Sequence, residues 1–110
     1  MQLWIPVAGP VTAPTPEHVQ RNIAVLRDAA LAVARLGHIP IFAHDLADPL
    51  RALDDRPGKQ ERYRELCIAL ARRCDAILLL DHSPGAVAEA SEFVFQAKPI
   101  YRRIEDIPKP

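Results

Sequence analysis

The sequence predicts a single α/β domain built on a parallel β-sheet, and three observations lead to it. Short apolar runs alternate with amphipathic helical segments, which is the pattern of βαβ units. The run Ala76–Leu80 is apolar without a break, as in strands buried on both faces of a parallel sheet. The chain has 110 residues, the size of one domain. We therefore expect a doubly wound, flavodoxin- or Rossmann-like sheet of about four to five strands, with helices on both faces.

The first predicted strand covers Leu3–Ala8 and ends at a Gly-Pro turn signal. Pro6 has no N–H to give to a neighbouring strand, so it predicts a bulge or a late start of this strand. A helix follows, with Thr15 as its N-cap and Pro16 in its first position. Apolar residues then recur at helical spacing until Gly37, which is a natural end for the helix.

Beyond the first helix the same signals predict three further strands and two further helices. The polar segment Asp45–Lys59 contains two prolines and a glycine, so we expect a loop there, with at most one helical turn around Leu50–Leu53. The first and third strands should be adjacent at the centre of the sheet. The remaining predicted elements are strands at Ile39–Phe42, Ala76–Leu80 and Pro99–Arg102, and helices at Gln60–Arg73 and Ala86–Ala97.

Composition excludes several classes of partner. The formal net charge at pH 7 is zero, so nothing points to nucleic acid or an anionic membrane. No segment approaches the roughly 20 apolar residues of a membrane span, and no secretion signal is visible. Cys67 and Cys74 do not have the spacing of a zinc site, and the four histidines form no helical metal pair. We expect a cytoplasmic protein without a metal or other cofactor.

The working site should lie at the carboxyl ends of the strands, where open parallel sheets bind ligands. The candidate binding residues follow the first, second and third strands. They are Gly9, Pro10, Val11 and Thr12, then His44 and Asp45, then Asp81, Ser83 and Gly85.

Glu89 is the candidate catalytic residue. It lies one turn into the predicted third helix, beside an apolar stripe, and has two interpretations: a solvated acid favoured by the helix dipole, or a nucleophilic carboxylate in the cleft. Ser83 can be the N-cap of that helix, can offer its hydroxyl to a phosphate or ribose oxygen, or can do both. Gly9-Pro10 is either a simple turn or a point where a ligand approaches the backbone closely.

Four stretches, taken in order, carry a resemblance to a known family. They are Ala8-Gly9-Pro10, Gly37-His38, Cys74-Asp75-Ala76-Ile77, and the segment from Ser83 through Gly85 to Glu89. Together they resemble the nucleoside 2-deoxyribosyltransferase-like superfamily, in which a segment starting with Ser or Asp has Gly two residues on and Glu six on. The resemblance covers nearly the whole chain.

The resemblance implies cleavage or transfer at the N-glycosidic bond of a nucleoside or nucleoside 5′-monophosphate. By resemblance, Glu89 attacks the anomeric carbon to form a glycosyl-enzyme ester, and Ser83 contacts the sugar or its 5′-phosphate. Many relatives have an Asp that assists the departing base where this chain has Cys67. The alternatives are a non-catalytic nucleotide- or nucleotide-sugar-binding domain and a purely structural interaction domain.

Self-association is also expected. The family is often dimeric or larger, with subunits completing each other's sites. Independently, Phe93, Val94 and Phe95 form an apolar run that one helix face cannot bury alone. Apolar surface of this kind often marks an interface, so we expect a homodimer or a larger homo-oligomer.

Overall fold

The computed structural model describes residues 1–110 and has four parallel strands in the order β2-β1-β3-β4. This confirms the predicted fold class and the central pairing of the first and third strands. The strands are β1 (Trp4–Ala8), β2 (Ile39–Ile41), β3 (Ile77–Leu79) and β4 (Ile100–Tyr101). The helices are α1 (Pro16–Leu36), α2 (Ala43–Leu53), α3 (Lys59–Arg72) and α4 (Pro84–Phe95), and a 3₁₀ turn, η1, covers Ile104–Asp106.

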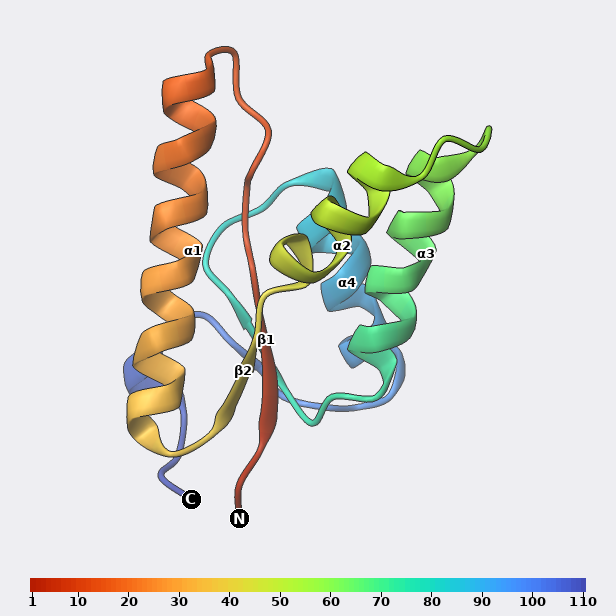
Figure 1. Ribbon diagram of the computed structural model, residues 1–110. Coiled ribbons are helices and arrows are strands. Elements are labelled where there is room, and N and C mark those ends of the chain that lie inside the picture. The colour runs from red at the N-terminus through yellow and green to blue at the C-terminus, as the bar shows by residue number, and fades with distance from the viewer.

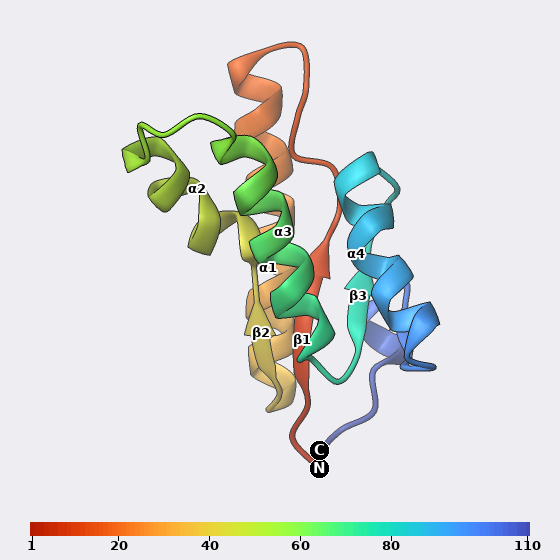
Figure 2. The same ribbon diagram turned by 90° about the vertical axis from the view of Figure 1, so that its right-hand side faces the viewer.

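Helices cover both faces of the sheet (Figure 1). On one face, α1 and η1 pack over a core that includes Ile5, Leu26 and Leu78. On the other face, α3 and α4 pack over a second core that includes Ile77 and Phe93. Figure 2 shows α2, α3 and α4 on the near side of the sheet and α1 behind it. None of the helices combines the length and the apolar character that a membrane span requires.

Pro6 lies inside β1, which begins at Trp4, so the expectation of a late strand start is wrong. Residues 4–6 of β1 pair with β2, and Pro6 stands opposite Ile41. Pairing of β1 with β3 involves only Val7 and Ala8, after the proline. A proline removes only its own N–H from the ladder, and the residues on either side of Pro6 still pair with the neighbouring strands.

The largest correction concerns the segment predicted as a loop. The first part of Asp45–Lys59 belongs to α2, an eleven-residue helix that begins at Ala43 and contains Pro49. Ala43 and Ala47 are buried one turn apart on its inner face. Pro49 removes one helical hydrogen bond, but burial of this face and packing against α3 hold the helix together.

Helix α4 begins two residues earlier than predicted, because Ser83 is its N-cap and Pro84 its first residue. The Ser83 Oγ accepts a hydrogen bond from the backbone N–H of Ala86 at 3.1 Å. The helix ends at Phe95, and Ala97 has a φ of 54°, in the left-handed region. No glycine marks this end in the sequence, which is why the prediction ran two residues too far.

Candidate functional site

A cleft of about 510 Å³ opens at the carboxyl end of the central strands. The chain leaves β1 toward β2 on one side and returns to β3 on the other, and this reversal of strand order is where such sheets bind ligands. Its walls come from the β1–α1 loop, α2, α3 and the start of α4. Eight of the sequence-predicted site residues line it: Gly9, Pro10, Val11, Thr12, His44, Ser83, Gly85 and Glu89.

Two predicted binding residues lie outside the cleft lining. Asp45 accepts two hydrogen bonds of 2.8 Å from the guanidinium of Arg27 on α1. This pairing holds the pKa of Asp45 below its ordinary value. Asp81 borders a separate, smaller hollow between the β1 and β3 loops and α1, and its Oδ1 accepts the N–H of His82 at 2.7 Å. Both carboxylates therefore have partners within the protein.

Glu89 projects from the second turn of α4 into the cleft. Its side chain is largely withdrawn from solvent, and its carboxylate forms no hydrogen bond or ion pair within the protein. Burial alone raises the pKa of Glu89 from its ordinary 4.5 to about 7. Desolvation has this sign because it disfavours the charged form. A buried carboxyl without a protein partner, facing a cleft, differs from the solvated helix acid that was the other interpretation of this residue.

Cys67 lines the same cleft from α3, and the Glu89 carboxylate interacts electrostatically with its thiol. Burial, with a smaller contribution from the Glu89 carboxylate, raises the pKa of Cys67 to about 11. The thiol therefore stays protonated at neutral pH and is a poor acid, nucleophile and metal ligand. No group of three or more His, Cys, Asp or Glu side chains is placed to hold a metal ion.

The start of α4 forms one rim of the cleft. Ser83 occupies two of the first free N–H groups of the helix: its Oγ accepts from Ala86, and its carbonyl oxygen accepts from Val87 at 2.8 Å. Pro84 has no N–H, and the N–H of Gly85, in the first turn of the helix, has no partner. The α-carbon of Gly85 faces open space, with no atom within 4 Å of the position that a Cβ would take there.

Gly9, on the opposite rim, has a packing reason to be glycine. A Cβ at this position would lie 3.0 Å from Cδ2 of Leu26 on α1. Gly9 therefore allows α1 to approach the end of β1 closely, and it also borders the cleft. This packing against α1 is a reason for the glycine that the sequence analysis, which considered a simple turn or the approach of a ligand, did not include.

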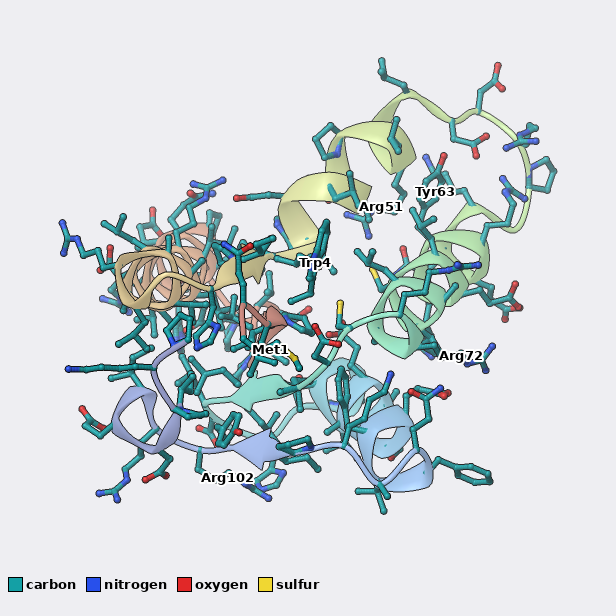
Figure 3. The ribbon with its side chains drawn as sticks, turned by 90° about the horizontal axis from the view of Figure 1, so that it is seen from below. Met1, Trp4, Arg51, Tyr63, Arg72 and Arg102 are labelled. Carbon is teal, nitrogen blue, oxygen red and sulfur yellow. The ribbon has the colours of Figure 1, made fainter.

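The far wall of the cleft carries a polar network between α2 and α3. Arg51 pairs with Asp48 one turn earlier on α2, and its Nη1 donates to Oε1 of Gln60 at 2.8 Å. His44 stacks on Phe42 with ring centroids 5.4 Å apart, and its Nδ1 is buried without a hydrogen-bond partner. Figure 3 shows the Arg51 and Tyr63 side chains in the space between the two helices.

Sequence reasoning missed most of this wall, because the segment that forms α2 was predicted to be a loop. Asp48 and Arg51 were therefore not considered as cleft residues. On α3, however, the signal was present: the cleft face repeats at helical spacing over Gln60, Tyr63, Arg64, Cys67 and Ile68.

A scan of the sequence against protein-family models finds no match, and a search among curated proteins finds none either.

Proposed function

We propose that this protein cleaves or transfers the N-glycosidic bond of a nucleoside or nucleoside 5′-monophosphate, with Glu89 as the nucleophile. The observation that carries the proposal is the Glu89 carboxyl, which faces the cleft without a partner and has its pKa raised to about 7. A buried carboxyl that is neither paired nor fully solvated costs stability, so a role in the cleft gives it a physical reason. The resemblance described above supplies the reaction class.

The reaction has two steps. In the first, a carboxylate oxygen of Glu89 attacks the anomeric carbon, and the bond from that carbon to the base nitrogen breaks. The electron pair leaves with the base, which takes a proton from water. In the second, water or an acceptor base attacks the anomeric carbon and the carboxylate is released. This is the logic of retaining glycosidases, in which a carboxylate traps an oxocarbenium-like sugar.

The nucleophile must be ionised to attack, so the pKa of Glu89 sets the acid side of the pH profile. Below pH 7 most Glu89 side chains are protonated and inactive. The value of kcat/KM should therefore rise through a midpoint near pH 7 as the carboxylate forms.

A second candidate is a nucleotide- or nucleotide-sugar-binding domain without catalysis, and Cys67 favours it. The relatives' Asp can protonate a departing base, whereas a thiol with a pKa of about 11 gives little such help at neutral pH. The cleft would then keep its binding rim and lack an acid for the leaving group.

The test is incubation of the protein with a panel of nucleosides and nucleoside 5′-monophosphates, with chromatography for free base. Release of base by the wild type and its loss in Glu89→Gln would support the enzyme. Glu92→Gln is the matched control, because Glu92 lies one turn further along α4 and pairs with Arg72 on the surface. Ligand-induced stabilisation without base release by any member of the panel would replace the enzyme with the binding domain.

We also propose that the protein forms a homodimer or larger homo-oligomer through the outer face of α4. Phe93 is buried in the core, but Phe95 is 93% exposed and Val94 is 69% exposed. Exposed aromatic surface next to other apolar residues is typical of an interface. Light scattering at micromolar concentration should give a multiple of the 12.2 kDa chain mass, and a monomer mass would contradict the proposal.

A further inference from the structure

Two arginines line the cleft, and they differ in what they contact. Arg51 on α2 is paired with Asp48 and bonded to Gln60. Arg64 on α3 forms no ion pair and donates no hydrogen bond within the protein. The charge of Arg51 is therefore neutralised locally, and the charge of Arg64 is not.

The register of α3 and α4 places Arg64 at the same height along the helices as the start of α4, and both line the cleft. In the chain, β3 lies between α3 and α4, and both helices run antiparallel to it. The two helices are therefore parallel to each other. Near their ends, Arg72 pairs with Glu92, with Nε and Oε2 3.0 Å apart. Since the rise per residue is the same in both helices, counting back equal steps from this pair brings Arg64 level with Pro84.

Three donors therefore line the cleft at the level of the start of α4. They are the Arg64 guanidinium, the unpartnered N–H of Gly85 and the hydroxyl hydrogen of Ser83, whose oxygen is occupied by Ala86. Two acids line the cleft: Asp48 is paired with Arg51 on the far wall, and the raised pKa of Glu89 leaves it partly neutral at pH 7. Donors of this kind, with a guanidinium among them, bind phosphate oxygens.

We propose that Arg64 is the residue that makes the cleft select a phosphorylated ligand, the nucleoside 5′-monophosphate, over its unphosphorylated nucleoside. This deepens the proposed function and rests on it. Arg64 holds the phosphate at the α4 rim and thereby positions the sugar between that rim and Glu89. It does not touch the reacting atoms, so it is a positioning and specificity residue.

The test compares wild type, Arg64→Gln and Arg73→Gln by calorimetry with a deoxynucleoside, its 5′-monophosphate and ribose 5-phosphate. Arg73 is the matched control, because it is an exposed arginine at the opposite end of α3, without an ion pair, and its loss changes the net charge equally. Wild type and Arg73→Gln should prefer the monophosphate by about tenfold, and Arg64→Gln should lose most of this preference. Affinity for the nucleoside should not change.

Ribose 5-phosphate separates recognition of the phosphate from recognition of the whole nucleotide, and its binding should also weaken in Arg64→Gln. Added salt should reduce the wild-type preference, because part of the contact is exposed. A preference that is equal in wild type and Arg64→Gln would overturn the role of Arg64, even if base release is observed. A preference lost in Arg64→Gln supports it, even if no base is released and the enzyme proposal fails. If the wild type binds none of the three compounds, both proposals fall.

Discussion

Polar side chains at the two ends of the sheet differ in what they contact. At the end where the strands begin, where both chain termini lie in Figure 1, they bind backbone groups of segments distant in sequence. At the end where the strands finish, several polar groups of the cleft have no protein partner. The bonded set at the first end is His38 with Leu3 and Pro108, Asp75 with Trp4, and Lys98 with Arg72 and Cys74.

We call the end where the strands begin the closed end, because its polar groups are hydrogen-bonded within the protein. His38 is an example. Its Nδ1 accepts the N–H of Leu3 at 2.9 Å, so its Nε2 carries the proton and donates to the carbonyl oxygen of Pro108 at 2.6 Å. One buried imidazole thus ties the start of β1 to the end of the chain. Both of its nitrogens are used, which leaves nothing to offer a ligand.

We call the opposite end, where the strands finish and the cleft lies, the open end. Several of its polar groups remain free to bind a ligand. Glu89 accepts no hydrogen bond and Arg64 has no counter-ion. Nδ1 of His44 is buried without a hydrogen bond, 3.6 Å from Oδ1 of Asp45. Unpartnered polar groups lower the stability of the folded protein. The closed end therefore contributes stability, and the open end reduces it. Changes at the open end should affect ligands and chemistry, and changes at the closed end should affect folding alone.

The largest expected effect is at Cys67. Cys67→Asp places a second carboxyl beside Glu89, and two adjacent carboxyls share a proton, so one can donate while the other attacks. If protonation of the departing base limits the reaction, the rate of base release should rise by about 10²–10⁴-fold. Chromatographic assay of free base from nucleosides and their monophosphates measures it.

Cys67→Asn is the control for this substitution, because the amide has a similar size to the acid and cannot donate its proton to a leaving base. An equal rate in wild type, Cys67→Asn and Cys67→Asp would show that acid help is not what limits the reaction. If none of the three proteins releases base from any compound, but a compound still raises the melting temperature, the binding-domain interpretation replaces the enzyme.

The sheet could be predicted from the sequence because each strand is an apolar run between turn signals. Ile77–Leu79 has no polar residue, and such a run is stable only between helix layers on both faces. The rim residues of β1 and α4 followed directly, because they come right after the strands. The special position of Glu89 was visible as a carboxylate beside the apolar stripe that contains Ala90 and Phe93.

The α2 wall could not be predicted in the same way, because its stability depends on tertiary packing. Pro49 and the neighbouring acids disfavour a helix locally, and only the burial of Ala43 and Ala47 reverses that preference. The partners of Asp45 were hidden for the same reason, since Arg27 lies on a helix distant in sequence. Burial of Glu89, which raises its pKa, likewise depends on how α3 and α4 approach each other.

The next largest effect should come from the closed end. His38→Ala removes two buried hydrogen bonds and leaves a small cavity, so the free energy of unfolding should fall by about 2–4 kcal/mol. Urea unfolding measures this as a lower midpoint with an unchanged slope. His82→Ala is the control, because His82 is exposed and its ring is hydrogen-bonded to the exposed Arg102, and it should cost less than about 0.5 kcal/mol.

The ligand affinity of His38→Ala shows whether a change at the closed end affects the cleft at the open end. At a temperature where His38→Ala is fully folded, it should bind nucleoside 5′-monophosphates as tightly as the wild type does. A weaker affinity in the folded variant would mean that the two ends are coupled. A loss of stability no greater than that of His82→Ala would mean that the imidazole does not tie the termini together.

The smallest expected effect is a gain of stability at the open end, from Glu89→Gln. In the unfolded chain this carboxyl titrates at its ordinary pKa of 4.5, and in the folded protein at about 7. The folded state therefore holds the proton more tightly, and the wild type loses stability as pH rises from 4.5 to 7. The loss is about 3 kcal/mol once pH exceeds 7.

Glu89→Gln has no such proton to lose, so its free energy of unfolding should exceed that of the wild type at pH 8 by up to this amount. At pH 4 the wild-type carboxyl is protonated in both states, and the two proteins should be equally stable. Urea unfolding across this pH range measures the difference, with Glu92→Gln as the control, because Glu92 is paired with Arg72 and should lose a little stability instead. Parallel curves for wild type and Glu89→Gln from pH 4 to 8 would show that the Glu89 carboxyl is solvated and paired like any surface acid. The contrast between the two ends of the sheet would then lose its chief example.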